Sequence, residues 1–250
     1  MPIHISGTGS FIPKNKVDNS SFSNKLFFDK DGNEYPNSND EIIEKFQTIT
    51  GIKERRYANK EHKTSDLATF AAQNAIKDAG IDKETIDYIV VAHNFGDIEY
   101  GTNQYIALPS VATMVKHKLN ILNENCVAYD IIFGCPGWIE GVIQASAFIK
   151  SKMAKRCLVI GADTLSRTID ESDRDSMIFA DGAGATIIEE NLEPGGILSH
   201  KTITKAGKEA LYLFCETSYN PKNTKSVKHI KMNGRKVYEF AISNIPGALK

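Results

Sequence analysis

The sequence predicts an α/β protein with a mostly parallel central sheet that helices cover on both faces. Strand-like runs such as residues 86–95 alternate with amphipathic helical patterns such as residues 65–79. The strand-like runs are apolar nearly throughout, which is typical of strands that are buried on both faces. With 250 residues and 41% hydrophobic content, the chain has enough apolar material for such a core.

The first third of the chain is expected to hold one strand and two helices. Residues 4–13 predict a strand followed by a turn. The polar run over residues 28–40 predicts a loop. Residues 41–50 and 65–79 have helical spacing, and each stretch is followed by a glycine that can end a helix.

The remaining segments continue this alternation. We expect helices over residues 107–119 and 136–154. We expect strands at residues 125–132, 155–163, 179–190 and 195–204, the third of them beginning with a glycine-rich turn.

Two glycine-rich runs do not predict a nucleotide site. Residues 7–13 lack the dinucleotide-binding fingerprint and are not followed by a helix, and residues 181–185 lead into a strand. We therefore interpret both runs as places where one backbone packs closely against another.

The cysteine pattern and the start of the chain exclude several classes of protein. Four cysteines are present without a CxxC pair or a zinc-like spacing to histidine, so we expect free thiols and no metal site. No run approaches the ~18 apolar residues of a membrane span. The first ten residues lack a signal peptide, so the cytoplasm is the expected location.

The stretch Phe133–Trp138, FGCPGW, is the strongest candidate for chemistry. Pro136 suits the first position of a helix, which puts Cys135 at or beside the helix cap. Unpaired N–H groups and the partial positive charge at a helix start stabilise a thiolate, and they can also receive an oxyanion. Position alone leaves open that Cys135 is a small core residue. The other three, Cys126, Cys157 and Cys215, are interpreted as buried strand residues.

Charge is distributed unevenly along the chain. Residues 201–250 hold ten Lys and Arg against three Asp and Glu, although the whole chain has a net charge of −1. Such a segment can bind nucleic acid, a membrane surface or an acidic protein, or it can be an ordinary solvated face.

Residues 129–190 resemble the nucleophile region of the β-ketoacyl-[acyl-carrier-protein] synthase III family. The motifs are the Cys135 corner, GADTLSR and the run DRDSMIFADGAGA. The resemblance extends to TGIKERRYA upstream and MNGRKVYEFAISNIP downstream, so it covers essentially the whole chain. It implies a thiolase-like fold, in which two similar α/β halves form αβαβα layers, usually as a homodimer. Residues 1–190 would form the N-terminal half and residues 191–250 the start of the C-terminal half.

The resemblance also implies a reaction. Cys135 would accept an acyl group from coenzyme A or a carrier protein. A malonyl group on acyl carrier protein would then lose CO₂, and its carbanion would attack the acyl group in a Claisen condensation. No metal or redox cofactor is implied. The expected partners are acyl carrier protein, an acyl thioester and a second copy of the chain, with neither nucleic acid nor membrane.

One departure from the family concerns the second substrate. Family members carry a histidine in an HQAN-like motif and a later asparagine, and this sequence has neither motif. The chain stops at Lys250, just inside the first long helix of the second half, so we expect the C-terminal half to be only begun. We accordingly predict that a polypeptide of this length accepts an acyl group but does not condense efficiently.

A second departure concerns the starter. The tryptophan and arginine that hold the adenine of coenzyme A in the family align with Lys45 and Ile49. The single tryptophan, Trp138, is expected to pack in the core. A weaker grip on coenzyme A is therefore expected, and the starter can arrive on a carrier protein.

The resemblance assigns further site residues. Arg167 matches an arginine near the phosphate end of the cofactor, Leu108 a residue that closes the acyl pocket of the partner subunit, and Phe179 an aromatic residue of the cavity. Arg235 and Lys236 lie where the family docks the carrier protein. Four further lysines, Lys222, Lys225, Lys228 and Lys231, are near them in sequence.

Two alternatives to a condensing enzyme of this family remain at this point. One is a thiolase-fold acyltransferase of secondary metabolism, which the altered starter region favours. The other is a non-catalytic partner subunit of a ketosynthase. Loss of the histidine and asparagine favours that partner subunit, and retention of Cys135 argues against it.

Overall fold

The computed structural model describes residues 2–249, which form two compact units built from interleaved stretches of chain. The first unit contains the chain up to Asn15, Arg56–Thr164 and Asp181–His200. The second contains Lys16–Arg55, Leu165–Ala180 and the chain from Lys201 onward. The division into residues 1–190 and 191–250 that the family resemblance implies stays a prediction.

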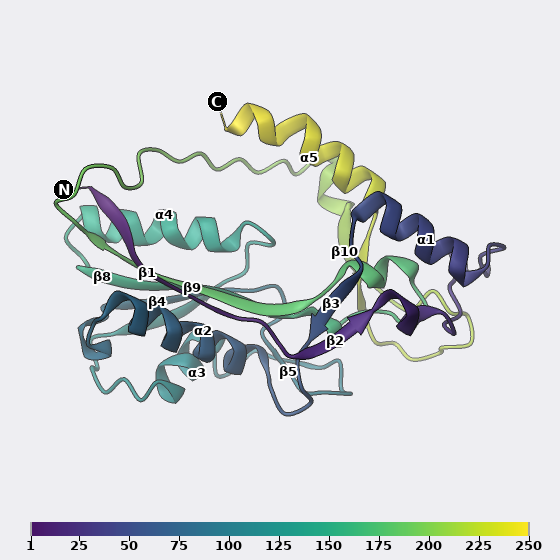
Figure 1. Ribbon diagram of the computed structural model, residues 1–250, viewed down its shortest axis with the longest axis horizontal. Coiled ribbons are helices and arrows are strands. Elements are labelled where there is room, and N and C mark those ends of the chain that lie inside the picture. The colour runs from purple at the N-terminus through teal and green to yellow at the C-terminus, as the bar shows by residue number, and fades with distance from the viewer. Residues whose placement is uncertain (1, 250) are drawn as a thin grey trace. The chain divides into compact units, whose positions relative to one another are not determined.

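A five-stranded mixed sheet forms the centre of the first unit, in the order β1–β9–β8–β4–β7 (Figure 1). The strands are β1 (Ile3–Phe11), β4 (Tyr88–Ala92), β7 (Val127–Ile131), β8 (Arg156–Thr164) and β9 (Asp181–Glu190). Strand β4 runs parallel to both β7 and β8. Strand β9 runs antiparallel to β8 and to β1. The expected parallel arrangement therefore holds for the β7–β4–β8 part of the sheet only.

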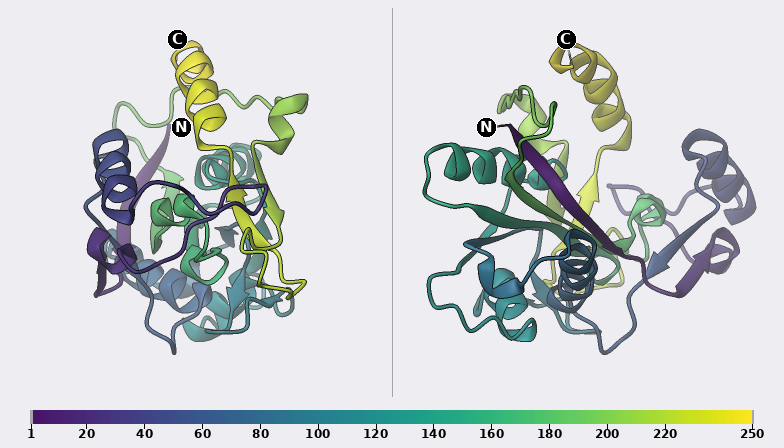
Figure 2. Two further views of the ribbon diagram at one scale, coloured as in Figure 1. Left: turned by 90° about the vertical axis from the view of Figure 1, so that its right-hand side faces the viewer. Right: turned by 60° about the vertical axis from the view of Figure 1, so that its left-hand side comes forward.

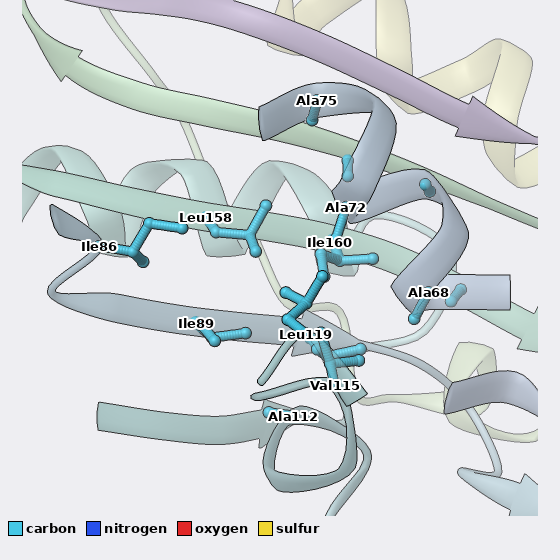
Figure 3. Close-up of a cluster of buried hydrophobic side chains, with 14 of the residues drawn as sticks. Ala68, Ala72, Ala75, Ile86, Ile89, Ala112, Val115, Leu119, Leu158 and Ile160 are labelled. Carbon is cyan, nitrogen blue, oxygen red and sulfur yellow. The ribbon is translucent and has the colours of Figure 1, made fainter. Parts of the chain in front are cut away.

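Helices cover both faces of this sheet, as the apolar strands predicted. Helix α4 (Gly137–Lys150) lies on one face, and α2 (Thr64–Ala79) and α3 (Val111–Lys118) lie on the other (Figures 1 and 2). Small side chains on α2, such as Ala68, Ala72 and Ala75, face Leu158 and Ile160 of β8 in the core (Figure 3). Burial of these apolar surfaces is the main force that holds the layers together.

One of the two glycine-rich runs is a close packing site, as expected, and the other is only partly explained. A Cβ atom at Gly9 of β1 would lie 2.2 Å from the carbonyl oxygen of Ala71 in α2. A side chain there would push the helix off the sheet, so glycine is required. A Cβ at Gly184 of β9 would meet nothing within 4 Å, so close packing does not account for that residue.

The described part of the second unit contains the α-helices α1 (Asn39–Thr50) and α5 (Gly234–Ala248) and the paired strands β10 (Leu213–Glu216) and β11 (His229–Met232). Strands β2 (Asn15–Asp18) and β3 (Glu54–Tyr57) form another pair. Ile42 of α1 packs with Phe22, Phe27 and Met177 in a small apolar cluster. The strand predicted over residues 195–204 is absent, since that stretch is irregular.

Two short strands complete the first unit. They are β5 (Asp97–Ile98) and β6 (Tyr105–Ile106), and they pair antiparallel to each other within the connection from β4 to α3. None of the helices over residues 2–249 is long and apolar enough to cross a bilayer.

Candidate active site

Cys135 lies on a tight turn between the end of β7 and the start of α4. The N–H of Gly137 donates to the carbonyl of Gly134 at 3.0 Å, which closes the turn around Cys135 and Pro136. Gly134 has φ of 74°, a conformation that glycine adopts without strain. Pro136 is the helix cap rather than the first helical residue, so the helix begins one position later than predicted.

The turn that leads into α4 is exposed at Cys135. The Cys135 side chain is exposed, and Pro136 provides no side-chain cap hydrogen bond to α4. N–H groups of a first helical turn have no partner inside the helix and point outward along its axis. A sulfur anion or an acyl oxyanion next to this turn would therefore meet hydrogen-bond donors and a partial positive charge.

Close packing of α4 on the sheet holds the corner in place. A Cβ atom at Gly137 would lie 2.8 Å from the Cβ of Ala92, the last residue of β4. The first turn of α4 thus lies against the carboxyl end of β4. Trp138 packs beside Gly161 and donates from its Nε1 to the Oγ1 of Thr186 at 3.2 Å, so its expected core role is confirmed.

The four cysteines differ in their surroundings. Burial raises the pKa of Cys126 to about 11 and that of Cys157 to about 12, so both stay protonated at neutral pH. Both are buried, as predicted. Cys215 is exposed on β10, so its predicted burial is wrong. Among the described residues this strand pairs with β11 alone, and three of its four residues are exposed.

A polar network at the carboxyl ends of the parallel strands was not foreseen from the sequence. His93, directly after β4, lies 2.9 Å from Asp130 of β7, between Nε2 and Oδ2. Asn94 donates to Asp163 of β8 from its backbone N–H at 3.0 Å and from its side chain at 2.7 Å. The signal was present, because polar residues that end apolar parallel strands gather at one sheet edge.

Asp130 is held as a carboxylate by its neighbours. Burial opposes its ionisation, but hydrogen bonds from His93 and from the N–H groups of Ala112 and Val111 keep its pKa below the ordinary value. Asp163 has the opposite balance, since burial raises its pKa in spite of the two bonds from Asn94.

Leu108, the predicted acyl-pocket residue, lies on the connection between β6 and α3. Its side chain is 83% exposed, and it makes no part of the core of its own unit. A large apolar side chain in this state is available to another surface. Its role stays a prediction.

Arg167 and Phe179 lie in the second unit and are both buried. Arg167 ends a 3₁₀ turn (Leu165–Arg167) and is 5% exposed, and Phe179 is 9% exposed. The second unit also holds a buried ion cluster that the sequence did not predict. Lys231 lies 2.5 Å from Asp170 and 3.2 Å from Asp173, and its ammonium lies 3.4 Å from the ring centre of Tyr219.

The predicted carrier-docking residues lie side by side in the first turn of α5. Arg235 and Lys236 both form ion pairs with Glu239, at 2.9 and 2.8 Å. The Arg235 side chain is 87% exposed. Lys231 was expected nearby on the same basic surface, but it is fully buried and paired, so that expectation is wrong.

Residues 2–249 hold no group of three or more His, Cys, Asp or Glu side chains that could bind a metal ion. The chemistry available between β7 and α4 is that of the Cys135 thiol beside the start of α4.

Part of the chain matches a known protein family. Residues 129–206 match the family of 3-oxoacyl-[acyl-carrier-protein] synthase III. This stretch contains the Cys135 corner, α4, β8 and β9.

Proteins and structures similar to this chain carry the same description. A β-ketoacyl-[acyl-carrier-protein] synthase III of Neisseria meningitidis is 37% identical over 239 residues, covering 95% of this chain and 67% of its own length. The Staphylococcus saprophyticus enzyme of that name is 37% identical over 244 residues. The match covers 97% of this chain and 67% of that enzyme. The crystal structure of the Aquifex aeolicus synthase III superposes with a TM-score of 0.76 at 30% identity, covering 95% of this chain and 67% of that one.

Proposed function

The chain belongs to the β-ketoacyl-[acyl-carrier-protein] synthase III family, and from this premise we propose that Cys135 is its acyl-accepting nucleophile. The family consists of acyltransferases of fatty-acid synthesis with a thiolase-like fold, and this chain is one of its condensing enzymes. The two alternatives, a non-catalytic subunit and an acyltransferase of secondary metabolism, are not favoured.

The proposed first step is a thioester exchange. The Cys135 sulfur attacks the acyl carbon of a donor thioester, and the carbonyl oxygen becomes an oxyanion beside the first turn of α4. The bond from this carbon to the donor sulfur then breaks, and the donor leaves as a thiol with the proton that Cys135 gave up. The acyl group stays on Cys135.

The proposed second step is the condensation. The family carries out this step with a histidine and an asparagine whose motifs these 250 residues do not contain, so we expect it to be inefficient here. Loss of CO₂ from a malonyl group on the carrier leaves a carbanion, which attacks the acyl carbon on Cys135. A carbon–carbon bond forms and the bond to the Cys135 sulfur breaks, so that the thiolate is regenerated and the product stays on the carrier. Electrons balance without a redox cofactor, and we propose that none is used.

The observation that carries this proposal is the contrast among the cysteines. Cys126 and Cys157 are buried with raised pKa values, and Cys215 lies on a strand. Only Cys135 combines exposure with a helix start among the described residues. A nucleophile needs both an accessible sulfur and stabilisation of its thiolate.

The test is acylation of the intact protein, followed by mass spectrometry. We expect one acyl adduct after incubation with an acyl-coenzyme A or an acyl carrier protein, located on the Cys135 peptide. Cys135→Ala should lose it, by about a hundredfold in rate or more. Cys215→Ala is the matched control, since it removes the other exposed thiol, and should keep the adduct. An adduct that survives in Cys135→Ala would contradict the proposal.

We further propose that α5 docks an acidic carrier protein through Arg235 and Lys236. Both side chains project from the exposed first turn, where positive charge would steer an acidic partner. Their shared partner Glu239 offsets part of this charge. Lys228 pairs with Glu216, and Lys222 and Lys225 are exposed on the connection from β10 to β11.

Charge reversal tests this docking surface. The double variant Arg235→Glu and Lys236→Glu should raise the dissociation constant for acyl carrier protein by about tenfold at low salt, and less at high salt. The double variant Lys14→Glu and Lys150→Glu changes the net charge equally at exposed sites and should bind normally. Equal binding by both variants, measured by titration, would show that α5 is not the docking surface.

Two further assignments complete the proposal. Ile49, at a position where the family holds the adenine of coenzyme A, is 73% exposed on α1, so we propose that the starter arrives on a carrier protein. Acylation by acyl carrier protein should then be faster than acylation by the same acyl-coenzyme A. We also propose a homodimer and a cytoplasmic location.

A further inference from the structure

One carboxylate joins three separate parts of the first unit. Asp130 of β7 accepts a hydrogen bond from His93 at 2.9 Å, from the N–H of Val111 at 2.8 Å and from that of Ala112 at 2.7 Å. His93 follows β4, whereas Val111 and Ala112 form the start of α3. Asp130 therefore ties both ends of the connection from β4 to α3 to the strand that leads to Cys135.

Several hydrogen bonds fix residues 94–97, the part of this connection that follows β4. Asn94 is bound to Asp163. The carbonyl of Gly96 accepts from Thr64 at 2.7 Å, and Asp97 accepts from the N–H and the hydroxyl of Ser65, both at 2.7 Å. These bonds hold residues 94–97 against β8 and α2.

The part of the connection that leads into α3, residues 108–112, depends much more on Asp130. Leu108 lies three residues before Val111 and is 83% exposed, as is expected of a side chain that extends away from its own unit. Val111 and Ala112 are the next residues with bonds to the sheet, and both bonds go to Asp130. A shift of Asp130 would therefore move Leu108.

Within residues 2–249 the imidazole of His93 makes one hydrogen bond. The imidazole is 5% exposed, Nε2 contacts Asp130, and Nδ1 is buried without a hydrogen-bond partner. A buried nitrogen without a partner costs free energy. The described contact that offsets this cost is the bond to Asp130.

We propose that His93 is a positioning residue that, through Asp130, sets the placement of Leu108 and with it the acyl-chain selectivity of the enzyme. This inference rests on the proposed function of Cys135, on the proposed homodimer and on the predicted role of Leu108 at the acyl pocket of the partner subunit. Loss of the Nε2–H donor would leave Asp130 with two donors and more freedom to turn. The start of α3 and Leu108 would then be less well defined, and the rate would depend less steeply on the length of the acyl chain.

The experiment compares His93→Ala, His93→Gln and His117→Ala in the full chain. Glutamine carries an N–H donor as many bonds from Cβ as Nε2 of histidine, so it should retain the bond to Asp130. His117 is an exposed residue of α3 and is the matched control. Two quantities are measured: hydrogen exchange at the amides of Val111 and Ala112, and the ratio of Cys135 acylation rates with octanoyl- and acetyl-coenzyme A.

His93→Ala should speed exchange at both amides by about tenfold. It should also bring the ratio of the octanoyl and acetyl acylation rates closer to one, by about tenfold. His93→Gln and His117→Ala should match the wild type in both. If either quantity is unchanged in His93→Ala, the proposal is overturned. Absence of any acylation of the wild-type protein would instead count against the proposed function, and the exchange data would still show whether His93 holds the start of α3.

Discussion

Asp175 shows how the surroundings of one residue set a pH dependence of stability. Burial, and next the charge of Asp173, raise its pKa to about 6, while Arg174 and Lys231 oppose the shift. Between about pH 4 and pH 6 the folded protein therefore holds a proton that the unfolded chain has released. Stability falls as pH rises through this window, and the full loss is present above pH 6.

Asp175→Asn should remove this loss. We expect the variant to be more stable than the wild type at pH 7.5, by about 1 kcal/mol, because solvent screens a side chain that is 37% exposed. The difference should shrink towards pH 4. Urea unfolding at pH 4.5, 6.0 and 7.5 measures it, and a constant difference across this range would contradict the assigned cause.

The two exposed cysteines show what residue type alone left undecided. The sequence placed Cys135 at a helix start and Cys215 in a strand, but only the structure shows that Cys215 is exposed as well. Pro136 was the signal for Cys135, because a proline after a strand predicts a helix start. No comparable signal distinguished the exposed face of β10.

At the scale of elements, β11 is anchored by a buried charge. Lys231 lies on this strand, and its partners Asp170 and Asp173 come from the stretch Leu165–Ala180. Lys231→Met would leave two buried carboxylates without their cation. We expect it to lower the free energy of unfolding by about 3–5 kcal/mol.

An exposed ion pair on the neighbouring chain segment provides the control. Lys228 pairs with Glu216 at the surface, so Lys228→Met should cost about 0.5 kcal/mol or less. Denaturant titration of both variants separates the two cases. Equal stability of the two would mean that the buried cluster contributes no more than a surface pair.

Helix boundaries show where local signals succeed and fail. The helices predicted over residues 41–50 and 65–79 are present as α1 and α2, each ending at a glycine. The helix predicted over residues 107–119 begins four residues later, at Val111. Pro109 disfavours a helical conformation at Leu108, and Ser110 caps the helix by accepting from the N–H of Thr113.

At the scale of the whole molecule, β7 is an edge strand of the central sheet. Within residues 2–249 it pairs with β4 alone, and Val127 and the nearby Ile132 are 46% and 71% exposed. An apolar edge invites pairing with another strand. We expect the proposed homodimer to form by pairing of β7 with its copy.

Val127→Lys should weaken such a dimer, because a charge on an edge strand opposes edge-to-edge pairing. We expect the dissociation constant of the dimer to rise by about tenfold or more. Sedimentation velocity over a range of concentrations measures it. Ile12→Lys, at a residue that is 68% exposed beyond the end of β1, is the control and should leave association unchanged. A dimer unaffected by Val127→Lys would place the interface elsewhere.

The sequence by itself determined the α/β class, the main helices and strands, the family and the cysteine at the helix start. These depend on local patterns: hydrophobic periodicity, capping residues and short motifs. The antiparallel half of the sheet, the interleaved units, the burial of Lys231 and the link from His93 to Asp130 were decided by the tertiary structure. Each of them depends on contacts between residues far apart in the chain, such as His93 and Asp130, which no local pattern encodes.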